Sequence, residues 1–471
     1  MSLWSAQEAA LATGGETAGD WQAEGVSIDT RTLQAGDLFV ALADQRDGHD
    51  FVAEALQKGA SAALVSRRPA DVLSDENLLY VQNVQAALEG LACAARHRSA
   101  AQVIAITGSA GKTSTKEMLR VMLQAQGKTH ASYASYNNHW GVPLTLASLP
   151  RDAAFAVVEI GMSNSGEIAP LARLVRPDAA LITTVAPAHL AAFENLEGIA
   201  REKAAIVQGL SAQGYAVLNA EAPCRSVMEQ AVAAKGCQSL WFGSGAAQAR
   251  ITQLSVKDGL MQVMTSIGDL SLKFELHTVG RHFAMNALGA LALLSKLNPD
   301  VEKAARVLAQ WQPAEGRGTR HQLHAPFGAV ELIDDAYNAN PISMQAALDV
   351  LAQATSSRRV AFLGDMKELG ADERAHHSAL AQLPAIRNID LIHTAGPLMA
   401  ALHHSLPVEK RGQHFANAKE MAACVEDLLQ ADDCILVKAS LSSGLRQVVD
   451  AIKIISQSDP DCAARPVERK R

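Results

Sequence analysis

The stretch from Val103 to Met118, VIAITGSAGKTSTKEM, constrains the fold more than any other part of the sequence. A short apolar run leads into a glycine-rich turn that ends in Lys112 and Thr113, and apolar spacing resumes at Met118. This order predicts a strand, a loop and a helix, because a strand buried on both faces is continuously apolar and a helix is apolar every three to four residues. The predicted fold class is α/β, with a central P-loop-type parallel sheet.

The loop has the chemistry of a phosphate cradle. Gly108 and Gly111 let the backbone approach an anion, the first helical N–H groups point at it, Lys112 adds a charge and the hydroxyl of Thr113 suits Mg²⁺. The alternative is a glycine-rich turn without a ligand, and the match to a full P-loop is incomplete because Ile106 stands where a glycine is usual. The predicted nucleotide-binding residues here are Gly108, Ser109, Ala110, Gly111, Lys112, Thr113 and Ser114.

Composition excludes several classes of protein. The 471 residues suggest about three domains, 48% of them are hydrophobic, and the net charge of −7 comes without a long basic run before the Arg465 to Arg471 tail. These features disfavour binding to nucleic acid or to a membrane surface. The six cysteines lack CxxC spacing, which favours reduced thiols. With no basic leader and no stretch of 18 apolar residues, we expect a cytoplasmic protein without membrane insertion.

The chain divides into three predicted units, residues 1–98, 99–318 and 319–471. In the first, we predict strands at 37–42 and 62–65 with a helix at 52–59 between them. Its loops SIDTR and RDGHDF combine hydroxyl, carboxylate and basic groups that suit a phosphorylated ligand, although solvated loops have the same composition.

The central unit brings more polar groups toward one sheet edge. The predicted strand 153–160 is apolar until Glu159, which places a carboxylate where a P-loop sheet binds Mg²⁺, unless it forms a buried salt bridge. The predicted strand 179–185 precedes His189, either a ligand or an ordinary loop residue. Asn137 and Asn138 precede a Gly-x-Pro turn, and turn chemistry alone would explain them. Spacing alone makes Lys203, in a predicted helix over 199–210, a solvated lysine.

The remaining pattern completes the fold prediction. Alternation beyond Gly243 indicates antiparallel strands, and a helix over 280–294 puts His282 and Asn286 on one face. EGRG at 315–318 is typical of a linker. The third unit alternates strands with helices, which predicts a C-terminal Rossmann-like sheet, and the absence of GxGxxG argues against a dinucleotide there. The polar tail from Ser456 is expected to be disordered.

Taken together, these segments resemble the Mur ligases, the ATP-dependent amide-forming enzymes of peptidoglycan synthesis. The similar segments are TGSAGKTSTKEM, YNNHWGVPLTL, VVEIGMSNSGEI, VAPAHL, GRHFAMNALGALAL and EGRG. Within the family, DDAYNANPISMQAAL and FLGDMKELG resemble signatures of the member that adds a dipeptide. Three segments depart from the family pattern: the loop ALADQRDGHDF is one residue short, Ala205 replaces a glutamate, and VKASLS has Ala439 and Leu441 in place of glycine and arginine.

The resemblance implies three domains, with ATP and Mg²⁺ as cofactors, and a specific reaction. ATP would phosphorylate the terminal carboxylate of UDP-N-acetylmuramoyl-tripeptide, and the amine of D-alanyl-D-alanine would attack the acyl phosphate and expel phosphate. Catalysis would rest on alignment and charge neutralisation. A monomer is expected. Rival interpretations are a diamino-acid-adding Mur ligase, a folylpolyglutamate synthase, a P-loop switch or motor, and a non-enzymatic binding module.

The resemblance also implies roles for individual residues. Lys112, His189 and Lys203 would be catalytic; Thr113 and Glu159 would hold one Mg²⁺, and His189 with a carbamylated Lys203 a second. The remaining ATP contacts would come from Asn137, Asn138, Asn286, Arg317 and Asp335. The uridine diphosphate end of the substrate would meet Ser27, Thr30, Arg31 and His49.

Overall fold

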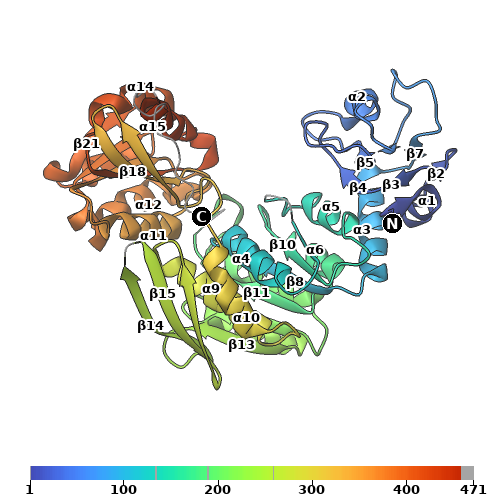
Figure 1. Ribbon diagram of the computed structural model, residues 1–471, viewed down its shortest axis with the longest axis horizontal. Coiled ribbons are helices and arrows are strands. Elements are labelled where there is room, and N and C mark those ends of the chain that lie inside the picture. The colour runs from blue at the N-terminus through green and yellow to red at the C-terminus, as the bar shows by residue number, and fades with distance from the viewer. Residues whose placement is uncertain (1, 133–134, 188–189, 258, 458–471) are drawn as a thin grey trace, which may run out of the picture.

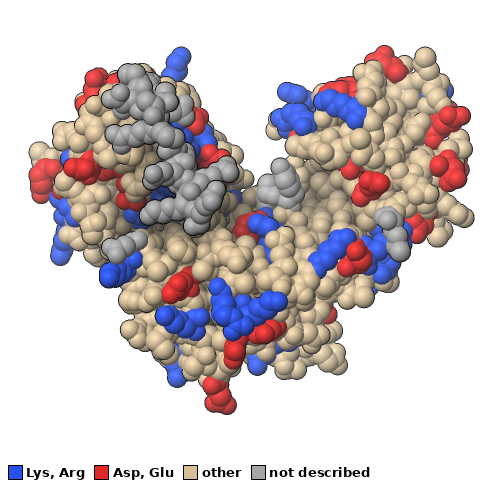
Figure 2. All heavy atoms as spheres, viewed as in Figure 1, with Lys and Arg blue, Asp and Glu red and all other residues tan. Residues whose placement is uncertain are grey.

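The computed structural model describes residues 2–132, 135–187, 190–257 and 259–457 and has three domains, each built on its own sheet (Figure 1). The first and third domains stand as two lobes on the central one. Figure 2 shows a wide notch between these lobes, with acidic and basic side chains interspersed over the visible face. No helix within the described ranges combines the length and apolar character needed to span a membrane.

The first domain packs helices against a five-stranded sheet of order β2-β7-β6-β5-β4, in which β4 to β7 are parallel. The strands are β2 Glu16–Thr17, β4 Gly25–Ser27, β5 Asp37–Val40, β6 Ala62–Val65 and β7 Leu78–Tyr80, and the helices are α1 Ala6–Thr13, α2 Val52–Gln57 and α3 Val84–Arg98. A short pair, β1 Trp4–Ser5 and β3 Gln22–Ala23, lies beside them. The predicted strand, helix and strand between residues 37 and 65 are confirmed; the first strand and the helix are slightly shorter, and the second strand has the predicted bounds.

The central sheet has nine strands in the order β16-β15-β14-β13-β12-β11-β8-β10-β9. Seven adjacent strands are parallel: β8 Gln102–Thr107, β9 Thr129–Ala131, β10 Phe155–Glu159, β11 Ala179–Ile182, β12 Tyr215–Asn219, β13 Gln238–Gly243 and β14 Ala249–Lys257. Beyond β14 the sheet continues with β15 Leu260–Ile267 and β16 Leu270–Leu276, each antiparallel to the strand before it, as the alternating pattern predicts. The carboxyl ends of β8, β10 and β11 therefore lie at one edge.

Helices cover both faces of this sheet and form two apolar cores. One face carries α4 Lys112–Gln124, α9 Arg281–Leu294 and α10 Val301–Val307. The other carries α3 with α5 Gly141–Ala147, α6 Ile168–Val175, α7 Leu196–Ala204 and α8 Arg225–Lys235. The predicted helix over 199–210 ends as an α-helix at Ala204 and continues as a 3₁₀ turn to Gly209.

The third domain has a six-stranded sheet of order β17-β18-β22-β19-β20-β21, parallel except for β17. Its strands are β17 Thr319–Ala325, β18 Gly328–Asp335, β19 Arg358–Gly364, β20 Leu391–Ala395, β21 Arg411–Phe415 and β22 Asp433–Lys438. Its helices are α11 Pro341–Ala352, α12 Glu373–Ala379, α13 Met399–Ser405, α14 Ala418–Leu428 and α15 Arg446–Gln457. Ser456, where we expected the tail to begin, still belongs to α15, and the tail from 458 lies outside the described residues.

Specific contacts join the first domain to the central one. The indole Nε1 of buried Trp4 donates to the carbonyl of Ala147, 2.9 Å away. Arg151 donates to both carboxylate oxygens of Glu8 at 2.7 Å and to the carbonyl of Leu3 at 3.2 Å. The N-terminal segment is thereby held against the loop that leads into β10.

Candidate active site

The phosphate loop lies between the end of β8 at Thr107 and the start of α4 at Lys112. Gly108 and Gly111 have φ values of 151° and 81°, in the region that favours glycine. A Cβ atom at Gly108 would collide with Thr183 Oγ1, and one at Gly111 would lie 2.7 Å from Asn286 Oδ1. Both glycines are therefore favoured by conformation, and at Gly108 the space beside Thr183 also excludes a side chain.

Hydrogen bonds from the next strand hold the loop in place. Thr183, just after β11, donates through Oγ1 to the carbonyl of Ala110 at 2.5 Å. The hydroxyl of Ser109 donates to the carbonyl of Ala186 and accepts from its N–H, both at 2.9 Å. Because the loop is fixed on both sides, its N–H groups are preorganised for an anion.

Lys112 extends back over the loop. Its Nζ donates to the carbonyl of Gly108 at 2.8 Å. Desolvation by burial lowers the pKa of Lys112, the charge of Glu159 opposes that shift, and the charge of Arg317 adds to it. A bound phosphate would replace the carbonyl as the partner of this cation.

Glu159, the last residue of β10, meets Thr113 as the sequence predicts. Thr113 Oγ1 donates to Glu159 Oε2 at 2.9 Å, and Asn137 Nδ2 donates to Glu159 Oε1 at 2.7 Å. Thr113 is 6% exposed and Glu159 1%. Among the described residues Glu159 thus contacts neutral groups and forms no salt bridge, which removes the structural alternative considered for it.

The Thr113–Glu159 pair fits Mg²⁺ by its chemistry. A carboxylate and a hydroxyl are the hard oxygen ligands that this ion prefers when phosphate oxygens and water supply the rest. Within the described ranges no three His, Cys, Asp or Glu side chains form a metal-binding group. His189, the predicted further ligand, lies outside the described residues.

Asn138 and Arg317 have different surroundings. Asn138 Oδ1 accepts from the N–H of Gly141 at 2.9 Å, which is turn chemistry at the start of α5. Arg317 stacks on Tyr337, 4.0 Å from the ring centroid, and donates to Ser135 Oγ at 2.8 Å. Ser135 Oγ is also 3.5 Å from Thr113 Oγ1, so Arg317 lies next to the predicted cation site.

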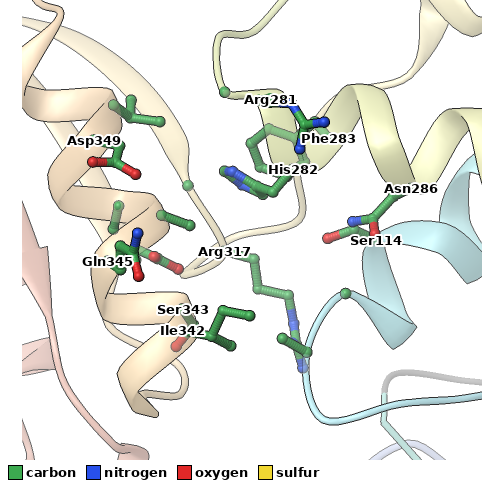
Figure 3. Close-up of a pocket in the computed structure, with 18 of the residues that line it drawn as sticks. Ser114, Arg281, His282, Phe283, Asn286, Arg317, Ile342, Ser343, Gln345 and Asp349 are labelled. Atoms are coloured by element: carbon green, nitrogen blue, oxygen red, sulfur yellow. The ribbon is translucent and has the colours of Figure 1, made fainter. Parts of the chain in front are cut away.

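A cleft of about 580 Å³ separates the central domain from the third (Figure 3). One wall carries Ser114 from α4 and Arg281, His282, Phe283 and Asn286 from α9; the other is α11, with Ile342, Ser343, Gln345 and Asp349. Ser109, Ala110 and Gly111 of the phosphate loop line the cleft, as do Arg317 and Asp335. The structure therefore brings together the phosphate-loop residues, Asn286, Arg317 and Asp335, all predicted to contact ATP.

Asp335 forms an ion pair in this cleft with a buried lysine. Lys438, at the end of β22, donates to Asp335 Oδ2 at 2.6 Å and to the carbonyl of Asn338 at 2.9 Å. Desolvation raises the pKa of the Asp335 carboxyl, and Lys438 opposes that shift. Asn340, at the start of α11, donates to the carbonyl of Ser109 at 3.2 Å and so connects the third domain to the phosphate loop.

Three residues in the cleft region make contacts that the sequence did not predict: Thr183, Asn340 and Lys438. Thr183 and Lys438 follow or end buried strands, and this position at the carboxyl edge of a sheet is a signal that could have identified them. Asn340 precedes proline at the start of a helix, a capping signal that does not reveal its contact with Ser109.

Lys203 is buried, so the interpretation of a solvated surface lysine is wrong. Its side chain, on α7, is 2% exposed, and its Nζ lies 3.8 Å from Met162 Sδ. Desolvation places the pKa of Lys203 well below its usual value; the charge of Lys112 contributes and Glu202 opposes the shift. Glu202 itself accepts from the backbone N–H groups of Gly166 and Ile168 at 2.7 Å.

The four residues predicted to bind the uridine diphosphate end lie in the first domain, away from the cleft. Ser27 lines a second cavity of about 480 Å³ between the first and central domains. Thr30 is buried, and exposed Arg31 pairs with Asp29 at 2.6 Å. His49 is buried, with Nδ1 2.6 Å from Asp47 and Nε2 accepting from the N–H of Ser66 at 2.9 Å, so both ring nitrogens have partners.

Comparison with known proteins decides the family. Residues 22–98 match the model of the Mur ligase family catalytic domain, 106–294 the Mur ligase middle domain, and 316–441 the Mur ligase glutamate ligase domain. An Escherichia coli UDP-N-acetylmuramoyl-tripeptide–D-alanyl-D-alanine ligase is 36% identical over 440 residues, which cover 91% of this chain and 94% of the relative. The chain belongs to the Mur ligase family. The family resemblance seen in the sequence is therefore confirmed.

Solved structures of Mur ligases share the fold. A MurF crystal structure from Acinetobacter baumannii has a TM-score of 0.84 at 30% identity, covering 96% of this chain and 99% of that one. A MurF structure from Thermotoga maritima in complex with ADP has a TM-score of 0.75 at 23% identity, covering 92% and 98%. The predicted three-domain α/β fold of this Mur ligase is confirmed.

Proposed function

We propose that this chain is an ATP-dependent ligase that joins D-alanyl-D-alanine to UDP-N-acetylmuramoyl-tripeptide in peptidoglycan precursor synthesis. The observation that carries the proposal is the convergence of Lys112, Thr113 and Glu159 beside the phosphate loop, whose residues 109–111 line the cleft. The chain also has near full-length similarity to ligases named for this reaction. The cleft volume suits a nucleotide, and the Thermotoga relative binds ADP.

The residues of this chain suit phosphoryl transfer to a carboxylate. Lys112, the loop N–H groups and Arg317 would bind the phosphates and neutralise charge that builds up as the γ-phosphoryl group moves. Thr113 and Glu159 would hold Mg²⁺, which when bound draws negative charge from the phosphate oxygens. Asn286 and α11 would position the nucleoside part across the cleft. The substrate carboxylate becomes an acyl phosphate, and the dipeptide amine then displaces phosphate.

We assign the second cation site to Lys203 and His189. The buried amine of Lys203 has a lowered pKa, which favours the neutral form that reacts with CO₂. The resulting carbamate is an anionic oxygen ligand.

We also propose the domain boundaries, the oligomeric state and the cellular location. Residues 1–98 would bind the UDP end through Ser27, Thr30, Arg31 and His49, residues 99–318 would bind ATP, and residues 319–471 would close over it. We propose that the protein is a monomer. A reaction that consumes ATP supports a cytoplasmic location.

Measurement of ADP release with each substrate combination tests the function. We expect turnover only when ATP, the UDP-tripeptide and D-alanyl-D-alanine are all present, because amide formation needs both an activated carboxylate and an amine. Full-rate ATP hydrolysis with either acceptor omitted would contradict the ligase assignment. Replacing the dipeptide by a diamino acid separates this activity from that of the diamino-acid-adding ligases.

A further inference from the structure

Lys116 is a fully buried lysine that none of the assigned chemistry uses. It lies one turn after Thr113 on α4, with an exposed fraction of 0%. Its Nζ donates to the carbonyl of Ser132 at 2.7 Å and lies 3.0 Å from Glu117 Oε1. Lysine is almost never buried this completely unless it is paired, because removing the amine from water is costly. Its contact with Ser132 therefore points to a positional role.

Ser132 connects Lys116 to the predicted cation site. It follows β9, is 3% exposed, and its N–H donates to the carbonyl of Val157 at 3.1 Å. Its Oγ accepts from the backbone N–H of Glu159 at 3.1 Å. Ser132 thus accepts a hydrogen bond from Lys116 through its carbonyl oxygen and one from the backbone of Glu159 through its hydroxyl.

This series of contacts, here called the relay, ends at the side-chain oxygen atoms of Glu159 and Thr113, the predicted Mg²⁺ ligands. Glu159 Oε2 accepts from Thr113 Oγ1 at 2.9 Å, so the buried contacts run from Lys116 through Ser132 and Glu159 back to Thr113 on the same helix. We infer that Lys116 is a positioning residue, which fixes Ser132 and thereby sets the orientation of Glu159 for Mg²⁺. This inference rests on the proposed nucleotide function.

The physical reason is the narrow geometric tolerance of Mg²⁺. This ion demands near-octahedral oxygen ligands at short distances, so a small rotation of Glu159 weakens binding while the nucleotide contacts of Lys112 and the loop N–H groups remain. Residues that orient a metal ligand typically change metal affinity by about 10- to 100-fold when they are mutated. Mutation of Lys116 should therefore reduce the gain in nucleotide affinity that Mg²⁺ provides. The nucleotide affinity measured without Mg²⁺ should change much less.

The experiment measures the dissociation constant of N-methylanthraniloyl-ADP with Mg²⁺ and with EDTA, and takes their ratio for each protein. Lys116→Met keeps an unbranched side chain that is one atom shorter and removes the donor. For this variant we expect the gain in nucleotide affinity from Mg²⁺ to fall by about tenfold or more. The dissociation constant in EDTA should stay within about twofold. A purely structural lysine would instead weaken binding equally under both conditions or lower only the melting temperature.

Two further variants make the test decisive. Arg120→Met is the matched control, because Arg120 lies on the same helix and contacts the same Glu117 at 2.6 Å but has no contact with the relay; its ratio should equal that of the wild type. Ser132→Ala removes the support of Glu159 and leaves the carbonyl that Lys116 contacts, so its ratio should fall like that of Lys116→Met. If Lys116→Met does not fold, Ser132→Ala decides.

An unchanged ratio in folded Lys116→Met, or in Ser132→Ala, would overturn the inference, as would a wild type that binds the nucleotide equally well with and without Mg²⁺. Failure of the wild type to bind the nucleotide under either condition would instead contradict the proposed function. The two failures are therefore distinguishable.

Discussion

The side chain of Asn340 joins two domains with its two ends. Its Nδ2 donates to the carbonyl of Ser109 in the phosphate loop at 3.2 Å, while its Oδ1 accepts from the N–H of Ser343 at 2.9 Å and caps α11. The amide is 4% exposed. These two hydrogen bonds therefore fix the start of α11 against the loop that would hold the phosphates.

Asn340→Ser is expected to separate these two contacts. Serine retains a capping oxygen but is too short to reach Ser109, so nucleotide affinity should fall about fivefold, the worth of one hydrogen bond of about 1 kcal/mol. The free energy of unfolding should change little. Asn340→Ala also loses the cap, which costs about 1 kcal/mol of stability. Nucleotide titration measures the affinity of each variant, and denaturant unfolding measures its stability. Equal nucleotide affinity in wild type and Asn340→Ser would show that the hydrogen bond to Ser109 does not contribute to binding.

Lys112→Ala is expected to abolish turnover. The amine that now contacts Gly108 would be missing where the phosphates need a cation, at a cost of at least about 3 kcal/mol, or more than about a hundredfold in kcat/KM. Lys128→Ala is the control, because this half-exposed lysine pairs with Asp152 away from the cleft. Near-normal kcat/KM in Lys112→Ala would mean that the loop is only structural.

Stability should fall in acid because of His282. Burial, reinforced by the charge of Lys438, lowers the pKa of His282 from 6.5 to about 4. Between pH 6.5 and 4 the unfolded chain therefore takes up a proton that the folded protein does not, so lowering the pH destabilises the fold. Between pH 7 and pH 5 this amounts to at most about 2 kcal/mol. In denaturant unfolding of His282→Gln, the free energy of unfolding should lose this part of its pH dependence. An unchanged pH dependence would mean that other groups cause it.

Lys203→Ala is expected to lose activity without losing stability. The mutation removes a desolvated amine, so the melting temperature should not fall, but it also removes the proposed carbamate. Added formate or acetate should restore part of the activity by placing an oxygen in the vacated space. Full activity of the mutant without any additive would reject the carbamate role.

The residues at the carboxyl edge of the central sheet could be predicted from the sequence because each of them belongs to a local sequence pattern. The phosphate loop, Glu159 at the end of β10 and the helix that carries Asn286 each have their own periodicity or turn chemistry within a few residues. Parallel strands then bring their ends to one edge, so the meeting of Thr113 with Glu159 follows from the fold class.

Contacts between distant segments were not predictable in the same way. Asn340 and Ser109 are 231 residues apart, and Asp335 and Lys438 are 103 apart. These contacts depend on how the third domain is placed and how β18 and β22 pair, and no local period encodes either. Lys203 illustrates the same limit, because spacing alone indicates a solvated lysine and packing buries it.

The division of the cleft between two domains bears on inhibitor design. Asn286 and Gln345 lie on opposite walls. If the third domain closes over the cleft as proposed, a compound that touches both residues would leave only after the walls separate. Its residence time would then be set by a collective domain motion, which is slower than the side-chain rearrangements that release a ligand bound to one wall. Compounds that span the cleft should therefore gain duration of action even where their equilibrium affinity equals that of a one-wall binder.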